Sequence, residues 1–119
     1  MSVYTIDFDG TLCQEAFPLI GKPIITTIEQ VKQLKQDGHQ LILWTCREGQ
    51  YLTDAIEWCK CFGLVFDTHN ANLPERIALY GTDPRKIGAD YYIDDKNVMV
   101  SGILQHRILN AIGEVIKVE

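Results

Sequence analysis

Two pairs of aspartates stand out as the residues most able to do chemistry. Asp7 and Asp9 flank Phe8 and are followed by Gly10, and a second acidic pair, Asp94-Asp95, comes late in the chain. Alternate residues of a strand face the same side, so Asp7 and Asp9 are predicted to point together while Phe8 packs the opposite way. Gathered carboxylates take up protons or recruit a cation. Mg²⁺, which binds carboxylates together with phosphate oxygen and water, suits such a set.

These acids, with a threonine and a lysine, predict phosphoryl transfer. A carboxylate can attack phosphorus while its neighbour moves a proton. The reaction otherwise needs alignment and charge neutralisation, which Thr45, Lys86 and backbone amides could supply. Taken singly, each residue also fits an ordinary role: Asp9-Gly10 suits a turn, Asp94 suits a helix N-cap and Lys86 suits a solvated surface. Their order at the ends of the expected strands favours the chemical interpretation.

Arg47 lies two residues after Thr45 and has two interpretations that the sequence leaves open. It could bind a second anionic group of the substrate through a bidentate contact. Equally, it could form a salt bridge with Glu48 or Asp54.

The elements that must position these residues alternate between strand and helix. Apolar and β-branched runs predict strands, and apolar residues at helical spacing predict helices, one ending at Asp37-Gly38 and another at Gly63. This alternation predicts right-handed βαβ units and a parallel sheet covered on both faces. Function in such sheets lies at the carboxyl ends of the strands. The expected strands are Val3–Phe8, Gln40–Trp44, Leu64–Phe66 and Asp90–Ile93; the expected helices contain Ile28, Val31 and Leu34, then Leu52, Ala55, Ile56, Cys59 and Phe62, then about Glu75–Leu79, and finally about Ile103–Ile116.

Length and charge limit the classes of function. A chain of 119 residues has room for one domain, 1–119, and its 46% hydrophobic content resembles that of an ordinary soluble protein with no membrane span. The 16 acidic residues outnumber the 11 Lys and Arg, which argues against an extended nucleic-acid groove without excluding a small basic pocket.

The four cysteines lack metal-binding spacing and the N-terminus lacks a signal-peptide pattern. Reduced thiols and a cytoplasmic location are therefore expected.

The run Asp7-Phe8-Asp9-Gly10-Thr11 resembles the first motif, D-x-D-G-T, of the haloacid dehalogenase-like (HAD) hydrolases. The apolar strand before Thr45 is similar to their second motif, Lys86 stands where their third-motif lysine is expected, and the strand ending in Asp94-Asp95 resembles the fourth. The resemblance covers about residues 3–97. It implies a HAD-like α/β fold, a Rossmann-like three-layer sandwich with a mainly parallel sheet.

The resemblance also implies a role for each motif residue in a Mg²⁺-dependent phosphatase. Asp7 would form an aspartyl-phosphate, and Asp9 would protonate the leaving oxygen, later activate water, and offer its backbone carbonyl to the metal. Asp94 would bind the metal directly, with Asp95 binding it directly or through water. For the phosphoryl group, Thr45 would donate a hydrogen bond and Lys86 would neutralise charge. A carboxylate at Asp9 favours phosphotransfer over dehalogenation.

The segments between the motifs are too short for the cap domain that many HAD proteins carry. A small flap, Cys13–Pro18, is expected near the site, with Phe17 packed against the core. The substrate expected is a small phosphorylated metabolite, a sugar phosphate or nucleotide. Two alternatives stay open: a polynucleotide end phosphatase, because Thr45-Cys46-Arg47 loosely resembles polynucleotide kinase-phosphatases, and a non-enzymatic Mg²⁺- or phosphate-binding regulatory module. The sequence also leaves open a homo-oligomer and the role of His69, expected in the loop after the third strand.

Overall fold

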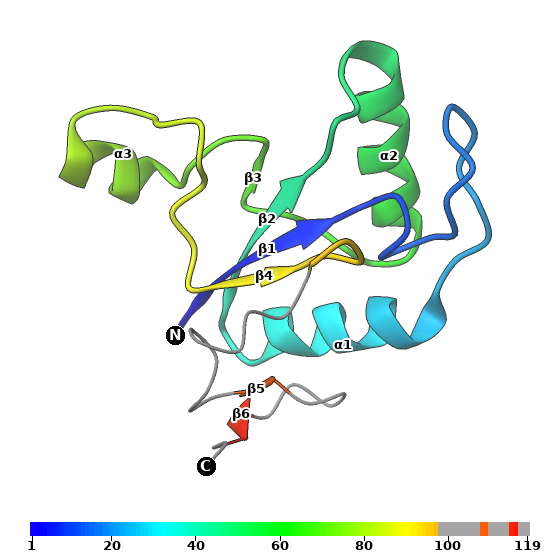
Figure 1. Ribbon diagram of the computed structural model, residues 1–119, viewed down its shortest axis with the longest axis horizontal. Helices are drawn as coiled ribbons and strands as arrows, with labels where there is room; N and C mark the ends of the chain where they lie inside the picture. Colours follow the sequence, from blue (N-terminus) through cyan, green and yellow to red (C-terminus); the bar gives the residue numbers. More distant parts are fainter. Residues whose placement is uncertain (98–107, 110–114, 117–119) are drawn as a thin grey trace.

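A four-stranded parallel sheet forms the centre of the protein (Figure 1). The computed structural model describes residues 1–97, 108–109 and 115–116. The strands lie in the order β3-β2-β1-β4, so β1 is flanked on both sides. All three pairings are parallel, which brings the carboxyl ends of the strands to one edge. The strands are β1 (Val3–Asp7), β2 (Gln40–Trp44), β3 (Thr68–His69) and β4 (Tyr91–Ile93).

Helices α1 (Ile25–Gln36) and α2 (Gly49–Cys61) cover one face of this sheet, and residues that flank α3 (Pro74–Tyr80) pack against the other. Ile6 of β1 and Leu43 of β2, which are register partners, pack in one buried cluster with residues of α1 and α2. Val3 and Ile42 point to the opposite face and pack with Leu73, the residue that precedes α3. The chain is therefore a three-layer, Rossmann-like α/β sandwich, as the alternation of elements predicted.

The ends of the first two helices follow the glycine signals in the sequence. Gly38 and Gly63 both adopt positive φ, at 90° and 80°, directly after the C-cap residues Asp37 and Phe62. Such left-handed residues end helices, and glycine adopts them without steric cost. The predictions of where α1 and α2 stop are confirmed.

The third strand lies later in the chain than predicted. The expected strand Leu64–Phe66 is wrong, because the residues that pair with β2 are Thr68 and His69. Leu64 and Phe66 are buried in the core, so their alternation reflects packing and not pairing in the sheet. The residue before this strand, Asp67, donates its backbone N–H to the carbonyl of Leu41 (2.8 Å), and the paired residues follow it.

The last helix predicted, about Ile103–Ile116, falls mostly outside the described residues. At its four described positions the structure has two short antiparallel strands instead, β5 (Ile108–Leu109) and β6 (Val115–Ile116), so the helix is wrong there. Three of these four residues are β-branched, which favours strand over helix.

A segment without regular helix joins β1 to α1 and includes the flap. Cys13 bridges both Asp9 and Pro23, which folds the segment back on itself. Figure 1 shows it as the blue loop that rises beside α2. Between β1 and α1, and between β3 and β4, the described chain holds only this segment and α3, so neither connection contains a cap domain.

Candidate active site

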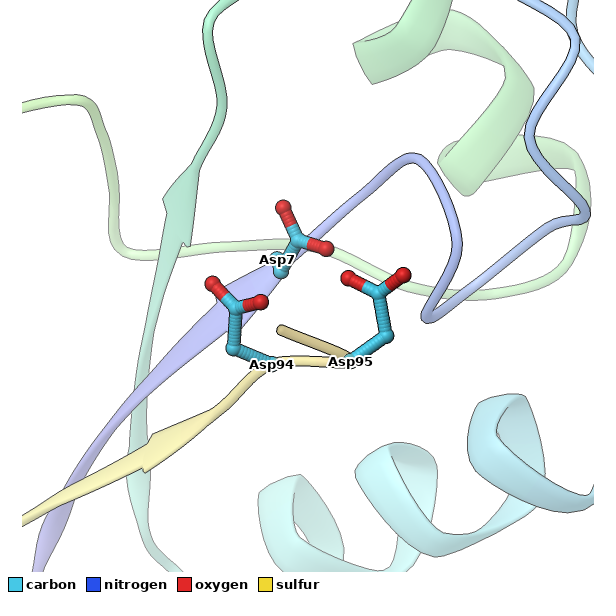
Figure 2. A group of neighbouring side chains, drawn as sticks. All are labelled: Asp7, Asp94 and Asp95. Atoms are coloured by element: carbon cyan, nitrogen blue, oxygen red, sulfur yellow. The ribbon is translucent and has the colours of Figure 1, made fainter. Parts of the chain in front are cut away.

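Three aspartates from neighbouring strands meet at the carboxyl edge of the sheet. Asp7 is the last residue of β1, and Asp94 and Asp95 directly follow β4, which pairs with β1. One carboxylate oxygen from each lies within 4.8 Å of the others. Figure 2 shows the three side chains directed toward a shared space. The prediction that the early and late acids meet is confirmed for these three.

Thr11 and Gly10 hold this group together. The Thr11 hydroxyl donates to Asp7 Oδ2 (2.9 Å) and accepts from the backbone N–H of Asp95 (3.1 Å), so one side chain links the two strand ends. Gly10 has a φ of +89°, and a Cβ added there would lie 2.2 Å from Asp95 Oδ2. A side chain at position 10 would therefore displace Asp95. Thr11 was not predicted to position the acids, although it belongs to the D-x-D-G-T motif.

The surroundings of Asp7 disfavour its charged form. Burial is the main cause that raises the pKa of Asp7 to about 7; the nearby charges of Asp94 and Asp95 raise it further, and the Thr11 hydrogen bond opposes the rise. Near neutral pH the group therefore gains free energy by taking up a proton or a cation.

Asp9 does not join the three carboxylates but is bound by Arg47. Arg47 Nε donates to Asp9 Oδ2 and Nη2 donates to Asp9 Oδ1, each at 2.8 Å. The Arg47 side chain is 1% exposed. Both partners proposed for Arg47, Glu48 and Asp54, are therefore wrong, and the guanidinium is not free to bind a second anionic group in this arrangement. The sequence analysis missed this pair because Asp9 and Arg47 are 38 positions apart and follow different strands.

Asn70 holds the turn that carries Thr45. The backbone N–H of Thr45 donates to Asn70 Oδ1 (2.8 Å), and the amide of Asn70 reaches the carbonyl of Arg47 (3.5 Å). Asn70 adopts a φ of +52°, a conformation that asparagine tolerates better than most residues. The Thr45 hydroxyl accepts from the N–H of Arg47 (3.1 Å). Asn70 is a positioning residue that the sequence analysis missed.

A pocket of about 550 Å³ opens over this edge of the sheet. It brings together most of the residues selected from the sequence and adds Lys96, whose Nζ lies 3.6 Å from Asp95 Oδ2. Lys86 is exposed and is not among the lining residues. The lining residues are Asp7, Asp9, Glu15, Phe17, Trp44, Thr45, Cys46, Arg47, Asp94 and Lys96.

Two further side chains differ from expectation. Phe17 lines the pocket and is 51% exposed, in edge contact with Tyr51, so the prediction that it packs against the core is wrong. His69 lies on β3 and not in the loop after the third strand; it makes an edge contact with Phe66 and is not among the pocket-lining residues. Burial, followed by the charge of Lys60, lowers the pKa of His69.

Comparison with known proteins identifies a relative. A solved structure described as the conserved protein coded by a locus from Bacteroides thetaiotaomicron is 40% identical, with a TM-score of 0.73, over 87% of this chain and 85% of that chain. This chain belongs to the family of that conserved protein. No family model and no curated protein matches the sequence. The description of the Bacteroides relative names no ligand or reaction, so function in this family has to be argued from the site.

Within residues 1–97 and the two short C-terminal strands, this family member has no helix with the length and apolar character that a membrane crossing requires.

Proposed function

We propose that this protein is a Mg²⁺-dependent phosphomonoesterase of the HAD type that forms an aspartyl-phosphate on Asp7. The observation that supports it most is the convergence of Asp7, Asp94 and Asp95 at a pocket that Thr45 also lines. The residues come from three strand ends, where parallel α/β sheets bind their ligands. A half-buried carboxylate beside two others costs stability, because the three repel one another, and this cost favours a role for them in binding or chemistry.

The three carboxylates fit a Mg²⁺ ion. Ligands on opposite sides of Mg²⁺ are about 4.2 Å apart, twice its bond length to oxygen. Of three such ligands at most one pair can be opposite, and neighbouring ligands are about 3 Å apart. The oxygens here lie within 4.8 Å of one another, so each side chain would have to move inward by less than about 1 Å for all three to share one ion. Asp7, Asp94, Asp95 and the backbone carbonyl of Asp9 would hold it. The ion would supply charge neutralisation for the phosphoryl oxygens.

In the proposed reaction Asp7 attacks phosphorus as the ester bond breaks. Asp9, after one of its oxygens has left Arg47 and taken up a proton from water, gives that proton to the leaving oxygen. Asp9 then takes a proton from the water that hydrolyses the aspartyl-phosphate. Thr45 lines the pocket, and its hydroxyl is proposed to donate to a phosphoryl oxygen. Lys96 lines the pocket where Lys86 does not, so we assign to Lys96 the neutralising role first expected of Lys86.

We propose a small phosphorylated metabolite, a sugar phosphate or nucleotide, as substrate. A pocket of about 550 Å³ is within the range that small-molecule sites occupy. The engagement of Arg47 by Asp9 and the net charge of −5 argue against a polynucleotide, which would present further phosphates. All four cysteines are free, which supports a cytoplasmic location.

Phosphate release from a panel of sugar phosphates and nucleoside monophosphates, with Mg²⁺ and with a chelator, tests this function. We expect turnover that requires Mg²⁺, is abolished by Asp7→Asn and is retained by Asp54→Asn. Asp54 is the matched control because it is an exposed aspartate on α2.

Beryllium fluoride separates the enzyme from a binding module, since it forms an aspartyl-phosphate mimic on a competent carboxylate. A folded protein that binds Mg²⁺ but neither turns over any substrate nor traps beryllium fluoride would contradict the proposal.

A further inference from the structure

We infer that the substrate is a nucleoside monophosphate, whose flat base stacks on Phe17 of the flap and Trp44 of β2 while its phosphate binds beside Asp7. This inference rests on the proposed function, because it names the part of the substrate that lies beyond the phosphoryl group at the same site. It selects the nucleotide from the two classes of small phosphorylated metabolite proposed above.

Most of the polar groups around the pocket already have a task at its acidic end. The residues that belong to the proposed phosphoryl-transfer site, or to the ion pair formed there, are Asp7, Asp9, Thr45, Arg47, Asp94 and Lys96. The rest of the lining consists of Glu15, Phe17, Trp44 and Cys46. A thiol is only a weak hydrogen-bond donor. Beyond the phosphate, the described lining therefore offers mainly two aromatic rings and one carboxylate.

Trp44 stands beside the proposed nucleophile. It is the last residue of β2 and the register partner of Asp7 on β1. Register partners on adjacent strands project from the same face of a sheet. The indole ring is 36% exposed and lines the pocket, and Thr45 follows it directly in the chain. Trp44 and Asp7 are therefore neighbours in the lining, one aromatic and one acidic.

Phe17 is the aromatic residue that the flap contributes to the pocket. Its ring makes an edge contact with Tyr51, with ring centres 5.4 Å apart, and its centre lies 5.0 Å from the guanidinium carbon of Arg47. Arg47 is itself held by the backbone carbonyls of Pro18 and Leu19, at 3.4 and 2.9 Å. These contacts support the ring, yet 51% of Phe17 stays exposed. The flap thus presents a supported aromatic surface to the pocket.

A flat base covers these rings better than a sugar does. Apolar surface exposed at a binding site gains free energy when a ligand removes it from water. Aromatic side chains bind bases by stacking, because every base has a π-face. A sugar phosphate would present hydroxyls there instead, which need hydrogen-bond partners once they leave water. Among the described lining side chains, Glu15 is the one strong acceptor beyond the phosphate, and N–H groups of a base can donate to it.

Two esters that differ only in the base test the inference. Ribose 5-phosphate is adenosine monophosphate without its adenine, so both present the same phosphate ester to Asp7. We measure kcat/KM for both, with Mg²⁺, in the wild-type chain, in Phe17→Leu, Phe17→Tyr and Trp44→Leu, and in the control Tyr80→Leu. Tyr80 is the matched control because it is 52% exposed, lies on α3 and is not among the pocket-lining residues.

Wild type should use adenosine monophosphate at least about tenfold better than ribose 5-phosphate, the scale that stacking of one base contributes. Phe17→Leu and Trp44→Leu should each lower kcat/KM for the nucleotide by about tenfold and for the sugar phosphate by less than about threefold. Phe17→Tyr keeps the ring and should keep the wild-type preference, and Tyr80→Leu should match wild type on both esters. Equal use of the two esters by wild type, or equal losses on both in Phe17→Leu and Trp44→Leu, would overturn the inference.

A short oligonucleotide with a terminal phosphate distinguishes a free nucleotide from the end of a polynucleotide. We expect wild type to use adenosine monophosphate better, because the chain has a net charge of −5 and would repel the further phosphates. Better use of the oligonucleotide would overturn the inference. A wild-type chain that hydrolyses sugar phosphates but not nucleotides would refute only the inference, whereas one that hydrolyses no phosphomonoester would refute the proposed function.

Discussion

Removing the charge of Asp7 should stabilise the metal-free protein while abolishing its activity. Asp7→Asn keeps the size of the side chain and an oxygen that can still accept from Thr11. It removes the repulsion between Asp7 and the two carboxylates whose oxygens lie within 4.8 Å. A variant that is more stable and inactive would separate the chemical role of Asp7 from any role in folding.

Coulomb's law gives the part of the effect that comes from repulsion. Two unit charges about 5 Å apart repel by about 0.8 kcal/mol in the dielectric of water, and Asp7 faces two such charges. The weaker hydrogen bond that Thr11 would make to an uncharged amide offsets about 0.5 kcal/mol of this gain. The variant also removes the cost of burying the charge, the main cause of the raised pKa of Asp7. We therefore expect a net stabilisation of at least about 1 kcal/mol near pH 8, where Asp7 is ionised, or an increase of at least about 4 °C in Tm for a chain of this length.

The pH dependence provides a sharper signature. The pKa of Asp7 is about 7 in the folded chain, above its ordinary value of 3.8, so the folded state binds the extra proton. Its contribution to stability is fully present below 3.8 and is lost as the pH rises through about 7. Without metal, wild type should lose stability across this window relative to Asp7→Asn. Added Mg²⁺ should restore wild type near pH 8 and affect the variant much less.

Thermal unfolding by circular dichroism measures these changes, at about pH 4.5 and about pH 8, with chelator and with Mg²⁺. Asp54→Asn serves as the control, because Asp54 is exposed and its loss should alter Tm little. If Asp7→Asn were less stable than wild type at about pH 8 in chelator, the three carboxylates could not be as close as the structure places them.

Two other substitutions test the supports of the site and the fold. Gly10→Ala should lower the free energy of unfolding by about 2 kcal/mol or more and weaken Mg²⁺ binding measured by calorimetry. The reason is that the new Cβ would lie 2.2 Å from Asp95 Oδ2 and that φ is +89°. Unchanged Mg²⁺ affinity would count against Asp95 as a ligand. Asn72→Ala should lower the free energy of unfolding in urea by about 2–3 kcal/mol and leave Mg²⁺ affinity unchanged. Asn72 is buried away from the pocket and is hydrogen-bonded to Asp83 (2.7 Å) and Gly88 (2.6 Å). A loss under about 0.5 kcal/mol would contradict this structural role.

Local patterns were enough to predict most of the sheet and its covering helices. The apolar run Gln40–Trp44 coincides with β2, and Gly38 and Gly63 mark where α1 and α2 end. These features depend on neighbours in the chain, namely side-chain alternation, helical spacing and the freedom of glycine at positive φ. The third strand was misplaced because burial and strand pairing produce the same apolar alternation, and only contact with β2 distinguishes them.

For the site, the sequence by itself determined which acids end up together. Asp7 and the pair Asp94-Asp95 end strands of a parallel sheet, so the direction of the chain places them at one edge. The tertiary structure alone decided the partners of the long side chains, which reach several ångströms from their own backbone. It paired Arg47 with Asp9 across 38 positions, left Lys86 outside and brought Lys96 into the pocket, because packing between separate elements sets those distances.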